Sequence, residues 1–215
     1  MSLLDSFDDL AKRQDLGMLE TYRLENLYVK SIFRKGGVCC FSVANKVSLA
    51  SELKSIIKSS YYSQELKGMA SRGIHAIDCR NVCKGDAYGF LSKVAEDKTN
   101  PIVVIENVTQ IPGEDAVHDN PDYVANLLLH SWKNEDIIVG DIHINRREIT
   151  VILTCPVEEE EVLKKVCALN SYAWCGDFDE WKNIRKNMAS SWAEKEYEEN
   201  GISNLAKEFA DRNAL

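Results

Sequence analysis

The chain opens with apolar residues at the three- and four-residue spacing of amphipathic helices. One set runs from Leu3 to Ala11 and a second from Leu16 to Phe33. This period gathers apolar side chains on one face of each helix. Gly36–Gly37 then ends the second pattern, because glycine is a poor helix former and a common helix stop. We expect helices within residues 1–36.

Beyond residue 37 the pattern changes to short, continuous apolar runs. Four runs predict strands: Val38–Val43, Ile74–Asp78, Pro101–Glu106 and Ile149–Thr154. Runs of this length, rich in Val and Ile, are typical of strands buried on both faces. Apolar residues at helical spacing follow each run, and this alternation predicts an α/β fold with a parallel sheet covered by helices on both faces.

A small hairpin interrupts the alternation before the last of these strands. Ile137–Val139 and Ile142–Ile144 flank Gly140-Asp141, which is a strong turn signal. We therefore expect a β-hairpin insertion at this point.

The C-terminal part is predicted to be mostly helical. A helix over Val157–Leu169 is followed by a short extended piece, Ser171–Trp174. Asp177-x-x-Glu180 then resembles a capping box at the start of a long helix. The chain divides into three predicted parts: N-terminal helices (1–36), an α/β core (37–175) and a helical tail (176–215).

Composition places the chain among ordinary globular proteins. It has 215 residues, of which 45% are hydrophobic and 28% charged, enough to bury a core in a single domain. No apolar run reaches the ~20 residues that cross a bilayer. The N-terminus lacks a basic segment followed by an apolar core, so we expect a cytoplasmic protein with no membrane contact.

The seven cysteines show no disulfide framework, and we expect reduced thiols. Cys79 and Cys83, with His75 nearby, come closest to a metal-binding pattern. Zinc sites normally add a second closely spaced pair of ligands, and none follows here. Buried thiols and no metal are therefore the expectation.

Charge is distributed unevenly along the chain, with a total of −8. Residues 1–100 carry 15 Lys and Arg against 12 Asp and Glu, and residues 101–215 carry 11 against 22. No helical face or run concentrates basic residues. We therefore expect no direct contact with nucleic acid.

From about residue 37 to 154 the order of these elements resembles the AAA+ ATPase core. The resemblance is strongest from Val103 to Thr154, where an acidic strand end is followed by VANLLLHSW, a VGD hairpin and ITVILT. This arrangement looks like that of Clp-type and MoxR-like AAA+ proteins, and the Trp-rich tail looks like the helical tail of MoxR-like members. The resemblance implies a P-loop NTPase-like fold, with a Walker A loop after the first strand, Walker B at Glu106 and sensor 1 after Thr154.

The implied Walker A position is Ser42 to Ser48, where Lys46 and Ser48 resemble the end of a phosphate-binding loop. Such a loop uses glycines so that backbone N–H groups approach the phosphates closely. No glycine is present and the loop is short. The alternative is an ordinary strand–helix turn, with Ser48 near the helix start and Lys46 in solvent.

The implied Walker B and sensor 1 positions also depart from the family pattern. Walker B normally ends in Asp-Glu, but here the strand ends in Glu106-Asn107. Asn107 cannot accept a proton from water, so the general base is absent. Thr154 fits sensor 1, whereas Pro156 falls where a polar residue is expected. The alternative for Glu106 is a carboxylate that binds a neighbouring loop.

Together these departures predict a pseudo-ATPase with no catalytic residues, no metal site and no required cofactor. Lys46, Ser48, Glu106, Asn107 and Thr154 are then vestiges of a nucleotide site, and the chain acts as a scaffold that binds a protein partner or itself. Two alternatives stay open. One is a nucleotide-binding protein or weak ATPase that holds ATP and Mg²⁺ in a rearranged loop. The other is an accessory subunit of a DNA-processing complex, similar to inactive clamp-loader subunits.

Overall fold

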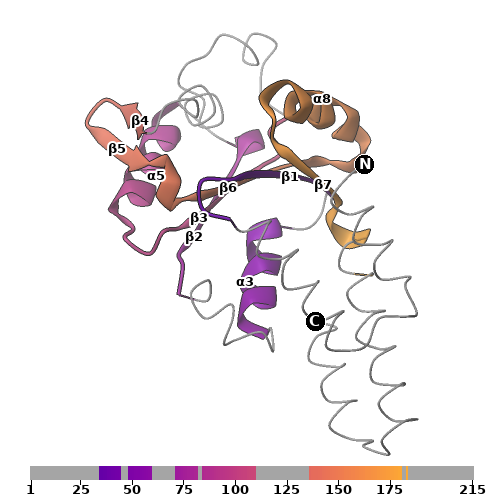
Figure 1. The fold of residues 1–215 in the computed structure, drawn as a ribbon, viewed down its shortest axis with the longest axis horizontal. Helices are drawn as coiled ribbons and strands as arrows, with labels where there is room; N and C mark the ends of the chain where they lie inside the picture. Colours follow the sequence, from indigo (N-terminus) through magenta and orange to yellow (C-terminus); the bar gives the residue numbers. More distant parts are fainter. Residues whose placement is uncertain are drawn as a thin grey trace, which may run out of the picture.

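The computed structural model describes residues 34–44, 48–59, 71–81, 84–109, 136–180 and 183. At its centre is a five-stranded parallel sheet in the order β2-β3-β6-β1-β7 (Figure 1). Its strands are β1 (Val38–Val43), β2 (Ile74–Asp78), β3 (Ile102–Glu106), β6 (Thr150–Pro156) and β7 (Ala173–Asp177). The predicted parallel α/β architecture is confirmed.

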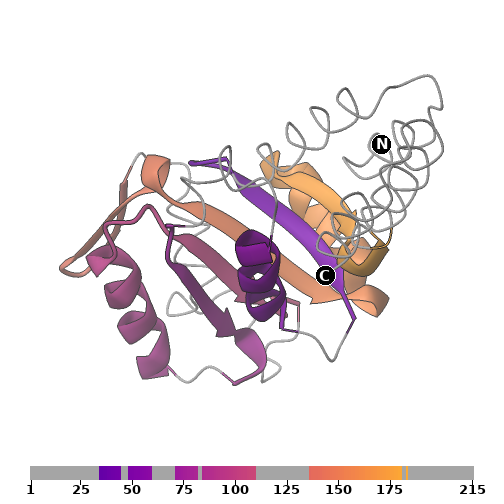
Figure 2. The same cartoon turned by 90° about the horizontal axis from the view of Figure 1, so that it is seen from below.

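Helices and a hairpin cover this sheet. The helices are α3 (Leu49–Ser59), α5 (Lys84–Glu96) and α8 (Glu160–Asn170), and the hairpin consists of β4 (Asp136–Val139) and β5 (Ile142–Asn145). Short 3-10 turns lie at Cys79–Asn81, Arg146–Glu148 and Val157–Glu159. One core cluster contains residues of α5, α8 and the hairpin, while α3 packs on the opposite face of the sheet (Figures 1 and 2).

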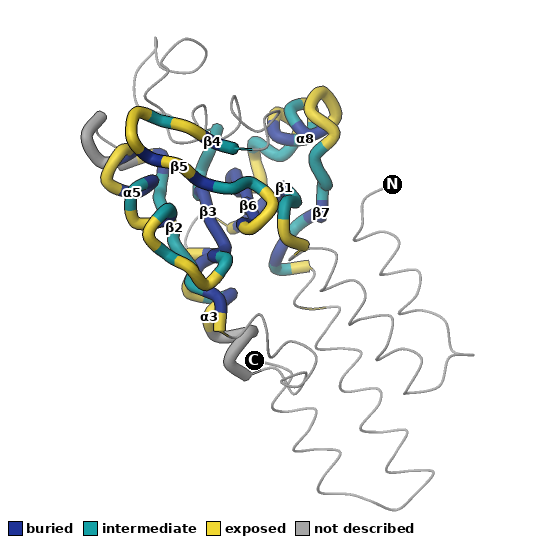
Figure 3. Tube along the Cα trace, turned by 60° about the vertical axis from the view of Figure 1, so that its left-hand side comes forward, coloured by how far each residue is buried: buried dark blue, intermediate teal, exposed yellow. Residues whose placement is uncertain are grey.

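Burial follows the position of each strand in the sheet. Every residue of β1 and β6 is buried, as are the first four of β3, whereas the edge strand β2 is only partly buried (Figure 3). Central parallel strands are covered on both faces, which explains the uninterrupted apolar runs that predicted them.

The hairpin is anchored to the core by one of its faces. Ile137, Ile142 and Ile144 are buried, while Ile138 on the other face is exposed. Gly140 adopts φ +62° at the turn, a conformation that glycine adopts without strain. The Tyr88 hydroxyl of α5 donates a hydrogen bond to Asp141 at the same turn. The predicted hairpin is confirmed.

Several element boundaries differ from the predicted ones. β6 continues two residues beyond Thr154, and the extended piece predicted at Ser171–Trp174 is a full strand, β7, that pairs with β1. Asp177 ends this strand and also accepts a hydrogen bond from the Glu180 N–H at 2.8 Å, which is the N-cap half of the predicted capping box.

Some predictions fall outside the described residues. They are the helices predicted within residues 1–36, the helix beginning at Pro121, and the tail beyond residue 183. No helix among the described residues is long and apolar enough to cross a membrane.

Candidate functional site

The carboxyl ends of the five strands lie along one edge of the sheet, because all five strands are parallel. Ligands of open α/β sheets bind at this edge, in the region where neighbouring strands connect in opposite directions. Each strand brings a polar side chain there: Ser42 from β1, Asp78 from β2, Glu106 from β3, Thr154 from β6 and Asp177 from β7. This edge is the candidate site.

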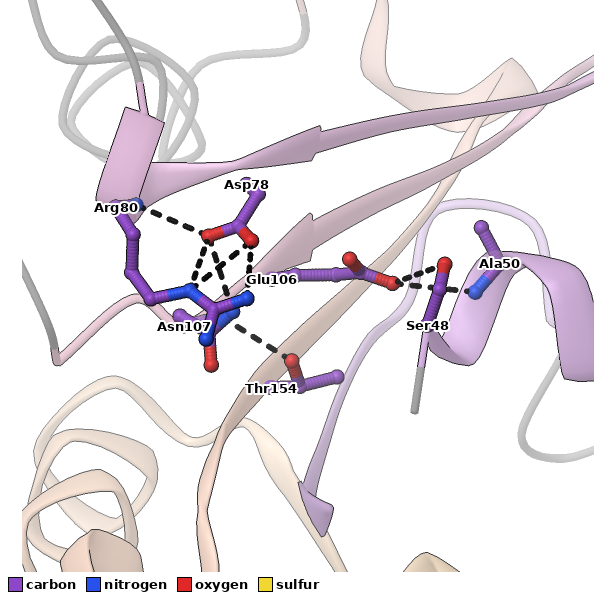
Figure 4. Close-up of polar contacts among 7 residues, drawn as sticks. All are labelled: Ser48, Ala50, Asp78, Arg80, Glu106, Asn107 and Thr154. Atoms are coloured by element: carbon purple, nitrogen blue, oxygen red, sulfur yellow. Dashed lines mark hydrogen bonds and ion pairs between the residues drawn. The ribbon is translucent and has the colours of Figure 1, made fainter. Parts of the chain in front are cut away.

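Glu106 links the end of β3 to the start of α3. Its Oε1 atom accepts hydrogen bonds from the Ser48 hydroxyl at 3.1 Å and from the Ala50 N–H at 3.2 Å (Figure 4). The first N–H groups of a helix have no partner inside the helix and carry partial positive charge, so a carboxylate is favoured there. The Glu106 carboxylate therefore occupies the start of α3.

Asp78 and Glu106 lie opposite each other in the pairing of β2 with β3, and Arg80 lies beside both (Figure 4). The Arg80 side chain binds both oxygens of Asp78, with a closest distance of 2.6 Å. The Arg80 backbone N–H donates to Asp78 as well, at 3.0 Å. Two neighbouring carboxylates would repel, and this guanidinium offsets that repulsion.

These contacts determine the charges of Asp78 and Arg80. Burial alone would raise the pKa of the Asp78 carboxyl, but hydrogen bonds from Arg80 and Asn107 outweigh burial and hold that pKa below its ordinary value. Asp78 and, to a smaller extent, Glu106 raise the pKa of Arg80 in turn. The carboxylate and the guanidinium are therefore both charged at neutral pH.

Asn107 joins three of the strand ends. Its side-chain amide donates to Asp78 at 3.0 Å, and its backbone N–H donates to the Thr154 hydroxyl at 3.3 Å. The next residue, Val108, donates its N–H to the Thr154 carbonyl at 2.9 Å. Asn107 adopts φ +56°, a left-handed conformation that asparagine tolerates better than most residues.

The structure brings four of the five predicted site residues to this edge: Ser48, Glu106, Asn107 and Thr154. Lys46 lies outside the described residues. Asp78 and Arg80 were missed by the sequence analysis, although Asp78 ends a predicted strand. The rule that parallel strands end at one edge would have placed Asp78 at the same edge as Glu106, although not next to it.

A second cluster of polar side chains lies further along the same edge, at the start of α8. The buried Ser42 hydroxyl donates to Glu160 at 3.3 Å, and Lys164 contacts both Glu160 and Glu161 at 2.8 Å. The Lys164 ammonium also lies 5.4 Å from the centre of the Trp174 ring. These contacts attach α8 to β1 and β7.

Within the described residues, no group of three or more His, Cys, Asp and Glu side chains is arranged to hold a metal ion. Cys79 is buried next to Asp78, and burial, with the Asp78 charge, raises the pKa of its thiol to about 12. Cys83, the other cysteine of the predicted metal pattern, lies outside the described residues.

Comparison with models of known protein families gives no match, and no curated protein matches the chain.

Proposed function

We propose that this protein is a degenerate AAA+-like domain that does not hydrolyse ATP and acts as a scaffold for a protein partner. The observation that carries the proposal is the use of Asn107 at the end of β3. A hydrolytic P-loop enzyme needs a residue that orients or deprotonates water. The Asn107 amide instead donates a hydrogen bond to Asp78, where it serves as a structural link.

The order of the strands supports the AAA+ ancestry. β6, which carries the sensor 1 position Thr154, pairs on one side with β1 and on the other with β3. The three positions implied by the resemblance therefore meet at one edge. An ATPase whose Walker A, Walker B and sensor residues all contact one phosphate group needs this adjacency.

The connection between β1 and α3 supports the loss of hydrolysis. Only Ala44 to Ser48 join the two elements, and none of these residues is glycine. A P-loop spans eight residues of the form GxxxxGK[ST], with backbone N–H groups that surround the phosphates. At the start of α3, the Ala50 N–H already donates to the Glu106 carboxylate.

A scaffold role is supported by the exposed side of α8. Val162 and Leu169 are seven residues apart, so both lie on the same side of the helix, and both are exposed. Leu169 retains 85% of its accessible surface. Large apolar side chains exposed on one side of a helix are a common feature of protein-binding surfaces.

The direct test is titration of the purified protein with ATP and Mg²⁺, combined with measurement of phosphate release. We expect no heat of binding and no turnover at millimolar nucleotide. Ser48→Ala is the matched control, because phosphate release from a contaminating enzyme is unaffected by this substitution. Turnover that disappears in Ser48→Ala would refute the proposal.

Nucleotide binding without hydrolysis is the second candidate, and the contact between Ser48 and Glu106 favours it. A hydroxyl beside a carboxylate is the pair that holds Mg²⁺ in P-loop proteins. In this case ATP binds with measurable heat, no phosphate is released, and binding weakens in Lys46→Ala and in Ser48→Ala. Unchanged binding in both variants would exclude this site.

A further inference from the structure

Exposed apolar side chains are concentrated on α8 and the turn before it. Among the described residues, five large apolar side chains are exposed: Tyr88, Ile138, Val157, Val162 and Leu169. Three of the five lie at positions 157 to 169, in the turn Val157–Glu159 and in α8. α8 lies at the β7 end of the sheet, on the face opposite α3 (Figure 1). The side of α8 that faces away from the sheet is therefore the strongest candidate for a binding surface.

Two sides of α8 differ in burial. Leu163 and Cys167 are buried, and both belong to the core cluster of the sheet. Val162 and Leu169 are 54% and 85% exposed, and Lys165, which is also exposed, lies between them along the helix. Residues three, four and seven positions apart share one side of a helix. Val162, Lys165 and Leu169 therefore form one row, which we call the outer side of α8.

The turn before α8 and the first turn of α8 are acidic. Residues 158–161 are four consecutive glutamates. Asp177 of β7 adds a fifth carboxylate at this edge of the sheet, opposite Ser42 in the pairing of β1 with β7. The Lys164 ammonium contacts two of the glutamates at 2.8 Å and offsets one of the five negative charges. An excess of negative charge therefore lies at the start of the outer side of α8.

The charges of this surface select the class of partner. Glu161 lies one turn before Lys165 and keeps 73% of its side-chain surface accessible, so it can pair with a cation from a partner. Carboxylates repel phosphate groups, which disfavours nucleic acid and anionic lipid headgroups, and they attract Lys and Arg side chains. An amphipathic helix repeats its apolar residues at intervals of seven, which is the interval between Val162 and Leu169. A helix with an apolar stripe and basic residues beside it therefore matches both features.

A second copy of this chain matches the surface poorly. A symmetric contact would pack α8 against its own copy about a two-fold axis. An axis midway between Val162 and Leu169 passes close to Lys165 and brings the two Lys165 side chains together. The acidic start of each α8 would then meet the last turn of the other, which has no basic residue and carries the negative end of the helix dipole. Like charges would meet at both places.

We infer that the outer side of α8 binds a basic amphipathic helix of a partner protein. Apolar side chains of that helix contact Val162 and Leu169, and its Lys or Arg side chains pair with Glu158 and Glu161 at the start of α8. This inference rests on the proposed scaffold function and specifies the class of partner.

The test uses two synthetic peptides of about 18 residues, which is long enough to form a helix. Both have the same apolar stripe, and the polar positions are Lys in one peptide and Glu in the other. Each peptide carries a fluorophore and is titrated with the full-length protein, with fluorescence anisotropy as the readout. We expect the Lys peptide to bind and the Glu peptide to bind at least about tenfold more weakly, because like charges across a contact repel. Added salt should reduce this difference, since the carboxylates are exposed.

Variants locate the contact on α8. Leu169→Ala should weaken binding of the Lys peptide about fivefold or more, as expected for a central apolar contact. Ile138→Ala is the matched control and should leave the affinity unchanged, because Ile138 is also exposed but lies on the hairpin. Glu158→Lys combined with Glu161→Lys should reverse the preference, so that the Glu peptide binds more tightly. Circular dichroism checks that each variant is folded.

The wild-type protein alone can overturn the inference. It fails if neither peptide binds at about 1 mM protein, or if both peptides bind equally well. A dimer in sedimentation that Leu169→Ala dissociates would identify a second copy as the occupant, and binding to phosphatidylserine vesicles in place of the Lys peptide would identify a lipid surface. Either result would also overturn it.

Measurement of ATP turnover in the same samples separates this inference from the proposed function. Turnover together with binding of the Lys peptide would refute the proposed function and leave the partner surface of α8 in place. Absence of both turnover and peptide binding would refute only the class of partner.

Discussion

Arg72 and Arg80 lie at opposite edges of the parallel sheet and differ in burial and in the groups that they bind. At the amino edge, Arg72 is buried, and its hydrogen-bond acceptors include three neutral groups: the carbonyls of Asn100 and Pro101 and the Thr150 hydroxyl. At the carboxyl edge, Arg80 is exposed and binds the Asp78 carboxylate. Burial lowers the pKa of Arg72, whereas the neighbouring carboxylates raise the pKa of Arg80.

This difference separates a structural edge from an edge available for binding. The Arg72 guanidinium joins the segments that lead into β2, β3 and β6, and the Thr150 hydroxyl donates in turn to the Arg34 carbonyl. Its contacts therefore contribute to folding stability. Arg80 is accessible to solvent, and charged pairs in solvent contribute little to stability. What the carboxyl edge offers is a set of positioned charges that a ligand or a partner can contact.

Substitution of Arg72 should give the largest effect on stability. Arg72→Ala leaves two carbonyls and a hydroxyl without this buried donor, and we expect a loss of about 3 kcal/mol in the free energy of unfolding. Arg80→Ala is the matched control and should lose less than about 1 kcal/mol. Urea denaturation measures both. Equal losses would show that the two edges do not differ in this way.

Asn107→Asp should have an intermediate effect that depends on pH. The new carboxylate faces Asp78 across 3.0 Å, where the amide donated before. We expect a loss of about 1–3 kcal/mol at pH 7. The repulsion raises the pKa of one carboxyl above its unfolded value, so the loss should shrink as the pH falls toward about 4 and that group is protonated.

The wild-type protein is expected to lose stability as the pH falls, whereas the loss caused by Asn107→Asp shrinks as the pH falls. The lowered pKa of Asp78 contributes stability that is present above its ordinary value of 3.8 and is lost as the pH falls through the folded pKa. The unfolding curves of wild type and Asn107→Asp should therefore converge in acid. Asn107→Gly, which accepts the left-handed backbone and removes the amide without adding a carboxylate, is the control. It loses only the contribution of the amide to the lowered pKa of Asp78, so its convergence with wild type in acid should be smaller than that of Asn107→Asp.

Ser48→Ala should have the smallest effect. The Ser48 hydroxyl donates to Glu106 in an exposed position, and the Ala50 N–H still holds that carboxylate after the substitution. We expect a loss of about 0.5 kcal/mol by thermal or urea denaturation. Glu106→Gln, which keeps an acceptor oxygen for both donors, should cost no more. A loss of several kcal/mol in either variant would mean that this contact supports the fold.

The fold could be predicted well from the sequence because buried parallel strands have a strong local signature. The runs at Val38–Val43 and Pro101–Glu106 are apolar without interruption, and both became central strands. Only a short extended piece was predicted where β7 lies, because the β7 sequence, AWCGD, mixes a glycine and an acidic residue with apolar residues. Its pairing also contains an irregularity opposite Cys40 and Phe41, which only the tertiary structure reveals.

The site was predicted in part, and the missing part has a physical cause. Ser48, Glu106, Asn107 and Thr154 were identified one by one from a family pattern. The hydrogen bond from Asn107 to Asp78 depends on strand order, whereas Arg80 lies only two residues after Asp78 and binds it locally. Sequence spacing does not give strand order, because residues 29 positions apart become neighbours only when β2 and β3 pair.

The strand order also has a consequence for how the chain is synthesised. β1 is among the first parts of the sheet to leave the ribosome, but both of its neighbours, β6 and β7, begin only at Thr150 and Ala173. Until those segments emerge, an apolar strand with two unpaired edges has no native partner. Long-range pairing of this kind folds slowly and exposes the nascent chain to aggregation. A nascent chain arrested before Thr150 should therefore depend on chaperones, whereas one arrested after Asp177 has every strand of the sheet.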